Sequence, residues 1–308
     1  MNLEKAKSLV SYVQIHGEQK TCYDWNMKHE SLFRRLREIK SKWGITPQQK
    51  LQLPKILLFD IETQAPIFRS WNPYPKFIPH KMLVKDWCII CWSAKWLYEA
   101  EVHNDKMTPE ESIVRNDERV VRSLWDMIDE ADIIIAHNLK KFDKKKANSR
   151  FLFYKMNPPS HYNMVDTLEA TKSQFGETYN GLDFLSSKFN GEGKLKTDID
   201  LWIACDDGDG DAIDEMSSYC DKDVFILEDY YLTIRKWIKS HPNLSLYVDA
   251  CEARCPNCGS ANIVDGGDYV TPANRYPGFR CECGYAGRYP QSMLSTDKRK
   301  SLTRSVAR

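Results

Sequence analysis

The stretch ILLFDIETQAP, residues 56–66, places two carboxylates two residues apart at the end of an apolar run. An unpaired charge is costly to bury, so Asp60 and Glu62 either meet partners inside the fold or hold a ligand. The apolar run predicts a buried strand, and residues two apart in a strand point to the same face. Both carboxylates therefore project together from the C-terminal end of that strand, where α/β sheets usually place their chemistry. Alone the pair is a weak signal, because most such pairs are solvated or salt-bridged.

Two further segments supply acids in a similar setting. The apolar strand ADIIIA, residues 131–136, is followed by HNLKKFD, which places Asp143 at the start of a helix, where the helix dipole favours an anion. The run SSYCDKDVFILEDYY, residues 217–231, predicts a helix on which Tyr219 and Asp223 share a face. Surface charges and helix caps are the alternative interpretation of these acids. Asp166, at a predicted strand-to-helix junction, is interpreted as a cap.

If they converge, Asp60, Glu62, Asp143 and Asp223 would repel one another and could not all stay ionised without cations. Oxygen ligands suit Mg²⁺ or Mn²⁺. Two such ions about 4 Å apart are the usual arrangement for in-line displacement at a phosphodiester. The set therefore predicts a two-metal hydrolytic site, with Tyr219 orienting the attacking water.

Read in order, FDIET, HNLKKFD and YCDKD resemble the three exonuclease motifs of DnaQ-like 3′–5′ exonucleases. The spacing of Tyr219 and Asp223 is similar to that of the tyrosine-type branch, DEDDy, and the whole stretch resembles bacteriophage-encoded exonuclease-like proteins. The resemblance spans about residues 55–240. It implies an α/β, RNase H-like mixed sheet flanked by helices. It also implies metal ligands at Asp60, Glu62, Asp143 and Asp223, with Tyr219 positioning water.

The pattern along the chain predicts four parts. Residues 1–46 form a helical, helix-turn-helix-like module, for which a simple helical appendage is the alternative; 47–246 form the exonuclease domain, 250–290 a zinc ribbon and 291–308 a basic, disordered tail. Apolar runs predict strands at 55–60, 87–97 and 131–136. Helical patterns are at 116–129, 143–154, 181–189 and 211–239.

The C-terminal part contains two cysteine pairs, in CPNCGS at 255–260 and RCECGYAGR at 280–288. Paired thiolates on tight turns suit one tetrahedral Zn²⁺, so we predict Cys255, Cys258, Cys281 and Cys283 as ligands of a structural zinc ion. The second pair is C-x-C rather than the usual C-x-x-C, so Cys251 is an alternative candidate for one of the four ligands. A disulfide is the alternative, and the scattered cysteines, Cys220 among them, are interpreted as packing residues.

Net charge is +1, so overall charge implies no partner, but residues 1–45 carry nine basic and five acidic residues. The predicted nucleic-acid contacts are Asn138, Lys140, Lys144, Arg34 and Arg35. Phe68, Trp71 and Tyr74 could stack on a base, although packing is an equal alternative for each. The acidic run at 206–211 fits no EF-hand and is predicted to be an exposed loop.

The sequence thus predicts a metal-dependent 3′–5′ exonuclease that acts on single-stranded 3′ ends, with DNA favoured over RNA. The alternatives are a nucleic-acid-binding or recruitment protein with an inactive domain, and a ribonuclease or endonuclease using the same site. The ribbon could also contact a replication or repair protein. With no signal peptide and no membrane span in the pattern, we expect a cytoplasmic protein, inside a bacterial host if phage-encoded.

Overall fold

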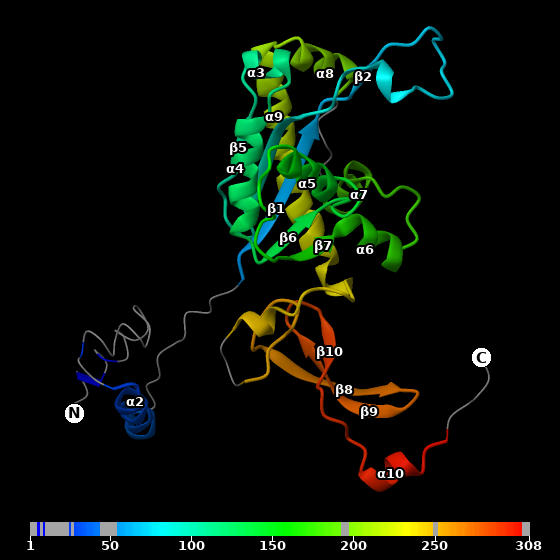
Figure 1. Cartoon of the computed structure of the whole chain (residues 1–308). Helices are drawn as coiled ribbons and strands as arrows, with labels where there is room; N and C mark the ends of the chain where they lie inside the picture. Colours follow the sequence, from blue (N-terminus) through cyan, green and yellow to red (C-terminus); the bar gives the residue numbers. More distant parts are fainter. Residues whose placement is uncertain are drawn as a thin grey trace. The chain divides into compact units, whose positions relative to one another are not determined.

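The computed structural model describes residues 5, 6, 9, 25, 28–43, 54–191, 197–248 and 252–303. The chain divides into two compact units, residues 1–53 and 54–308 (Figure 1). In the first unit, α2 (His29–Trp43) buries Leu32 and Ile39 against Ala6 and Leu9. Arg34 and Arg35 are exposed on this helix. The remainder of the predicted helix-turn-helix lies outside the described residues, so that module stays a prediction.

A five-stranded mixed sheet forms the centre of the second unit. Its strand order is β5-β4-β1-β6-β7. The strands are β1 (Ile56–Thr63), β4 (Ile89–Trp96), β5 (His103–Lys106), β6 (Ile133–Ala136) and β7 (Asn163–Asp166). β1 pairs antiparallel with β4 and parallel with β6, and β6 pairs parallel with β7. A mixed sheet of this kind, with helices on both faces, is compatible with the RNase H-like fold that the sequence predicts.

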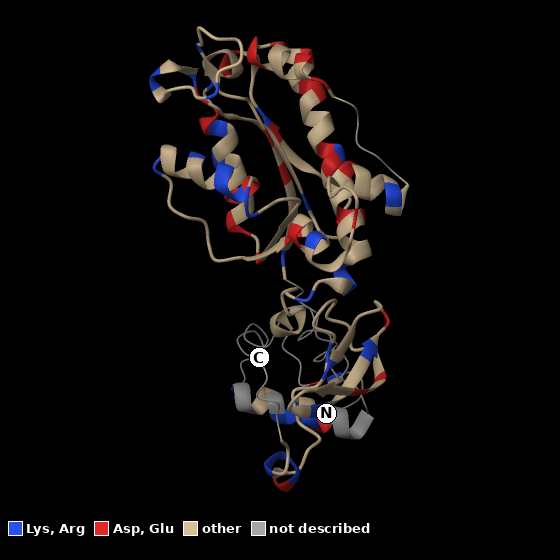
Figure 2. Ribbon diagram, turned by 90° about the vertical axis from the view of Figure 1, so that its right-hand side faces the viewer, with Lys and Arg blue, Asp and Glu red and all other residues tan. Residues whose placement is uncertain are grey.

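The alternating side chains of β1 divide the core into two layers, and Figure 2 shows the sheet between two sets of helices. Leu57, Phe59 and Ile61 belong to the core beneath α4 (Glu118–Asp129) and α5 (Asp143–Phe153). Ile56 and Leu58 belong to the core beneath α7 (Leu182–Asn190) and α9 (Gly210–Ile234). Because side chains two apart share a face, Asp60 and Glu62 continue the second row and face α9.

Shorter elements connect this framework. They are β2 (Ile67–Phe68), η1 (His80–Met82), β3 (Leu83–Lys85), α3 (Pro109–Val114), α6 (Thr167–Gln174), α8 (Ile199–Asp206), η2 (Arg235–Trp237) and η3 (Leu244–Tyr247). The three predicted strands and four predicted helices are present, but the last helix ends at Ile234 and continues as η2, earlier than predicted. None of the described helices is long and apolar enough to cross a membrane.

The C-terminal segment of this unit forms a separate three-stranded antiparallel sheet. Its strands are β8 (Ile263–Thr271), β9 (Asn274–Cys281) and β10 (Ala286–Arg288), in the order β10-β9-β8. The buried Asn257 side chain donates a hydrogen bond to the Arg235 carbonyl at 2.9 Å and so ties this segment to η2. The predicted tail is not wholly without structure, because Ser295 caps a short helix, α10 (Thr296–Lys300).

Candidate active site and cysteine cluster

Three of the predicted carboxylates meet between β1 and α9. One oxygen from each of Asp60, Glu62 and Asp223 lies within 4.8 Å of the other two. Asp60 and Glu62 are half-buried, whereas only 1% of Asp223 is exposed. The buried row that follows on α9, which includes Val224 and Leu227, fixes the rotation of the helix and turns Asp223 toward the sheet. The structure therefore brings together two carboxylates from β1 and one from α9, which are about 160 residues apart in the sequence.

Asp143 lies beside this group rather than within it. It begins α5, has 1% of its surface exposed, and is outside the set of oxygens that lie within 4.8 Å of one another. Burial, followed by the nearby Asp60 carboxylate, raises the pKa of Asp143 well above its ordinary value, and Asp166 and Glu62 act in the same direction. Among the residues that the structure describes, no group donates a hydrogen bond to its buried Oδ1 atom.

The donor chemistry of this site fits a divalent cation. The converging atoms are carboxylate oxygens, which hard cations such as Mg²⁺ and Mn²⁺ prefer. A buried carboxylate oxygen without a hydrogen bond is costly unless a cation or a proton compensates it, and Asp143 presents such an atom. Asp60, Glu62 and Asp223 thus form an acidic group that could hold a divalent metal ion, with Asp143 adjacent.

Tyr219 lies one turn before Asp223 on α9, as the spacing predicts. Only 9% of the residue is exposed. It belongs to a small core cluster with Ile90, Met216 and Cys220. Its ring therefore has a packing role, and the predicted role of its hydroxyl in orienting water stays a prediction.

Cys220 contacts the site directly, although the sequence suggested only packing for it. Its thiol donates to the carbonyl oxygen of Asp60 at 3.5 Å and to Oδ2 of Asp60 at 3.8 Å. Burial raises the pKa of Cys220 well above the ordinary thiol value, which keeps the proton on sulfur and preserves the donor. Nothing in the local pattern signals this contact, because it depends on how α9 packs against β1.

Asp166 is a cap, as predicted, and also organises the loop that leads to Asp143. Its Oδ1 accepts from the backbone N–H groups of Leu168 and Glu169 at 3.0 and 3.1 Å, at the start of α6. The same carboxylate accepts from the N–H groups of Asn138 at 3.2 Å and Lys140 at 3.0 Å. One side chain on β7 therefore holds the turn between β6 and α5.

The predicted nucleic-acid contacts are placed unevenly. Asn138 has a φ of +76°, a left-handed conformation that asparagine tolerates better than most residues. The conformation of the turn is therefore a reason for asparagine at this position, besides the predicted contact with nucleic acid. The Nζ atom of Lys140 pairs with Glu169 at 2.6 Å, in an ion pair that is exposed to solvent. Lys144 is half-buried on α5. The role of all five residues, Asn138, Lys140, Lys144, Arg34 and Arg35, in binding nucleic acid stays a prediction.

The structure corrects two expectations, one about the aromatic residues after β1 and one about the acidic run before α9. Trp71 and Tyr74 are 97% and 87% exposed, so the packing alternative is wrong for them, while Phe68 is 39% exposed on β2. The acidic run at 206–211 is not simply an exposed loop. Asp206 pairs with Arg115 at 2.7 Å and Lys85 at 3.3 Å, and Asp209 caps α9.

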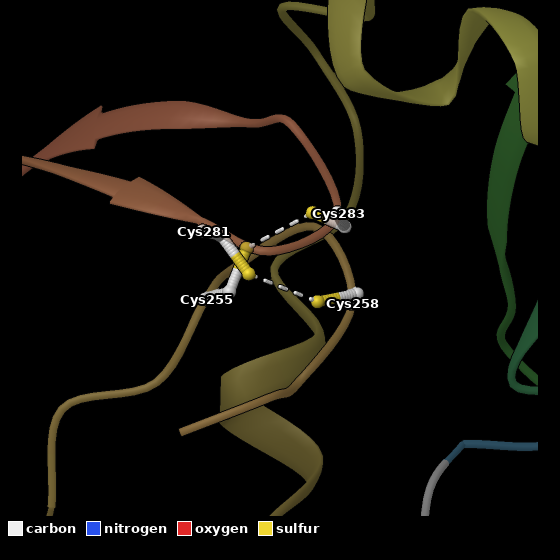
Figure 3. A group of neighbouring side chains, drawn as sticks. All are labelled: Cys255, Cys258, Cys281 and Cys283. Carbon is white, nitrogen blue, oxygen red and sulfur yellow. Dashed lines mark hydrogen bonds between the residues drawn. The ribbon is translucent and has the colours of Figure 1, made fainter. Parts of the chain in front are cut away.

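The four predicted zinc ligands converge at one point (Figure 3). The Sγ atoms of Cys255, Cys258, Cys281 and Cys283 all lie within 4.8 Å of one another. Cys258 and Cys281 are separated by 3.5 Å, and Cys255 and Cys283 by 3.8 Å. A disulfide would require about 2.05 Å, so the disulfide alternative is wrong for these pairs. With Zn–S bonds of about 2.3 Å, sulfur atoms of a tetrahedral site lie about 3.8 Å apart, and the cluster fits zinc.

The turns that carry these thiols have the geometry of metal-binding knuckles. Gly259 and Gly284 adopt φ values of +76° and +85°, which glycine accepts without a steric penalty. Their N–H groups donate to the carbonyls of Cys255 and Cys281 at 2.8 and 2.9 Å, which closes each turn. The C-x-C pair, Cys281 and Cys283, therefore directs its two thiols to the same point as the C-x-x-C pair, Cys255 and Cys258. Cys251 lies outside the described residues, so its predicted role as a substitute stays untested.

No protein-family model matches the sequence, and no curated protein matches it either. Among solved structures, the chain is similar to the family B DNA polymerase from the hyperthermophilic archaeon Pyrobaculum calidifontis, with 16% sequence identity and a TM-score of 0.44. The match covers 59% of this chain but only 25% of the polymerase, and at this level it carries no conclusion about activity.

Proposed function

We propose that this chain is a metal-dependent 3′–5′ exonuclease that hydrolyses the terminal phosphodiester of nucleic acid, with single-stranded DNA ends as the favoured substrate. The observation that carries the proposal is the convergence of Asp60, Glu62 and Asp223, whose oxygens lie within 4.8 Å of one another. The order of the three motifs, and their resemblance to DnaQ-like exonucleases, supply the direction of cleavage.

In this proposal Asp60, Glu62 and Asp223 hold divalent cations, and Asp143 joins them through its buried carboxylate. Two Mg²⁺ or Mn²⁺ ions, when bound, lower the pKa of water and stabilise negative charge on the attacking and leaving oxygens. The Cys220 thiol orients Asp60 through the hydrogen bonds to its carbonyl and carboxylate. Asp166 positions the turn from which α5 presents Asp143.

The Tyr219 hydroxyl is proposed to hydrogen-bond the attacking water. Tyr219 lies one turn before Asp223, on the same face of α9. Its buried ring packs in a cluster with Ile90 and Met216. A side chain that is locked by packing orients a small molecule more accurately than a mobile one, and orientation contributes strongly to rate.

The test is a substrate panel with Mg²⁺: 5′-labelled and 3′-labelled single strands, duplexes and circles of DNA, and matched RNA strands. We expect stepwise loss of 3′-terminal nucleotides from linear DNA, and a fall of at least about 10³-fold in turnover for Asp60→Ala and Asp223→Ala. Asp126→Asn is the matched control, because Asp126 is an exposed acid on α4, and it should keep wild-type turnover.

Each alternative has its own result in this panel. Equal degradation by wild type and both alanine variants would indicate a contaminating nuclease and remove the enzyme proposal. Binding of strands without any cleavage would support a recruitment protein with an inactive domain. Cleavage of circles would indicate an endonuclease, and a preference for the RNA strands would indicate a ribonuclease at the same site.

A further inference from the structure

The loop between β2 and β3, residues 69–82, presents large aromatic side chains to solvent; we call it the aromatic loop. Trp71, Tyr74 and Phe77 are 97%, 87% and 80% exposed. Large apolar side chains are usually buried, and several of them exposed within seven residues mark an interaction surface. In Figure 1 the segment after β2 extends away from the five-stranded sheet. A hollow of about 500 Å³ is lined by these three rings together with Arg69 and Lys76.

The charge of the aromatic loop indicates what it binds. The loop contains Arg69, Lys76, His80 and Lys81, and no acidic residue. Arg69, Lys76 and Lys81 are all exposed. A surface that mixes rings with cations complements an anionic chain whose flat groups are free to stack. Single-stranded nucleic acid has both properties, whereas a duplex keeps its bases stacked on one another.

The aromatic loop is also anchored close to the carboxylate group. Glu62 and Ile67 are five residues apart, so their Cα atoms are separated by at most about 18 Å. The N–H of Arg69 donates to the Met82 carbonyl at 3.0 Å and closes the base of the loop. Within it, the N–H of Tyr74 donates to Oδ1 of Asn72 at 2.9 Å. These bonds and three prolines restrict the backbone, so less conformational entropy is lost when a ligand binds.

We propose that the aromatic loop is a docking surface for single-stranded nucleic acid, with bases stacking on Trp71, Tyr74 and Phe77 and phosphates contacting Arg69, Lys76 and Lys81. This inference rests on the proposed nuclease function and adds to it. The carboxylates act on the terminal phosphodiester, and the loop holds the strand that leads to it. Stacking on the aromatic loop makes the enzyme selective for unpaired strands longer than a dinucleotide.

The first experiment measures binding in an Asp60→Ala background, where the strand is not cut. Fluorescence anisotropy compares this parent with the same chain carrying Trp71→Ala, Tyr74→Ala and Phe77→Ala, using a labelled twelve-residue oligo-dT. Because one stacked base contributes a factor of about 5 to 150 in affinity, we expect a loss of tenfold or more. Leu152→Ala removes an apolar side chain that is 78% exposed on α5, and should leave the affinity unchanged.

The second experiment tests the phosphate contacts. For single strands the slope of log K against log salt is about −0.7 for each neutralised phosphate. Replacing Arg69, Lys76 and Lys81 by Gln should therefore make the slope shallower by about 2, whereas the triple alanine variant should keep the parental slope. Equal affinities of parent and triple alanine variant, or a slope unaffected by the Gln substitutions, would overturn the inference. A duplex that competes as well as oligo-dT would overturn its single-strand selectivity.

The binding assay can fail or succeed independently of the proposed activity. In the chain with Asp60 intact, hydrolysis of the p-nitrophenyl ester of thymidine 5′-monophosphate requires no second base. If the aromatic loop docks the strand, the triple alanine variant lowers the ratio of activity on oligo-dT to activity on this ester by about tenfold. If the wild-type chain cleaves neither compound, the proposed nuclease activity is wrong. The difference in anisotropy between parent and triple alanine variant then still decides whether the aromatic loop binds single strands.

Discussion

The two clusters of side chains that could hold a metal ion, the carboxylates and the cysteines, are built in opposite ways. The carboxylate group takes Asp60 and Glu62 from β1 and Asp223 from α9, two elements that are held together by large apolar clusters. The cysteine cluster takes its four thiols from two short turns. Among the described residues 252–303, Phe279 is the one large apolar side chain that is buried. We therefore expect the α/β core to fold without a cation, and the C-terminal segment, which has little apolar core of its own, to depend on a metal ion for its stability.

Removing the zinc ligands should give the largest structural effect. For the paired substitutions Cys258→Ser and Cys281→Ser, we expect the zinc content to fall from about one equivalent to none. The C-terminal segment should then be cut rapidly by protease, while the five-stranded sheet and its helices resist, because their core does not contain the four clustered cysteines. Metal analysis and limited proteolysis measure both effects.

Cys88→Ser is the control for this experiment. It also replaces a buried thiol, but one in the core beneath α4, so it should leave the zinc content unchanged. A chain purified without chelator that contains no zinc, or a double variant as protease-resistant as wild type, would contradict the stated difference between the two clusters.

Tyr219→Phe sharpens the comparison at the carboxylate group. The substitution keeps the ring that packs with Ile90 and Met216 and removes only the hydroxyl. We expect kcat to fall by about tenfold or more, and KM to change by less than about threefold, because water is misplaced while the phosphate contacts remain. Tyr247→Phe on η3 is the control and should change neither constant. An unchanged kcat for Tyr219→Phe would reject the water-orienting role.

Asp166→Asn should give the smallest effect of the series. Asparagine retains Oδ1, the acceptor for three of the four backbone N–H groups, but replaces Oδ2, which accepts from Lys140 at 3.0 Å, and removes the charge. We expect a loss of about 1–2 kcal/mol in the free energy of unfolding and a modest fall in turnover. Urea titrations followed by circular dichroism measure the stability, with Asp126→Asn for comparison. A midpoint equal to that of wild type would show that the turn does not depend on this carboxylate.

Local pattern was sufficient for the cysteine cluster and for the main strands and helices. In each cysteine pair the two cysteines and the glycine that follows them lie within a few residues of one another, so the geometry of each pair depends mainly on its turn. The apolar runs of β1 and β6 are continuous, and the buried row of α9 repeats with the period of a helix, so both patterns can be recognised. β5 and β7 have four residues each, and their sequences, the wholly polar HNDK and the half-polar NMVD, show neither pattern.

The sequence alone predicted the candidate metal ligands of this protein and whether each one lies on a strand, a helix or a turn. Tertiary packing determined that Asp60, Glu62 and Asp223 meet while Asp143 lies beside them, that the Cys220 thiol supports Asp60, and that Lys140 pairs with Glu169. It also left the rings of the aromatic loop exposed. The physical reason is that periodicity records which face of an element is apolar, whereas the separation of groups from distant segments depends on strand order and on helix packing.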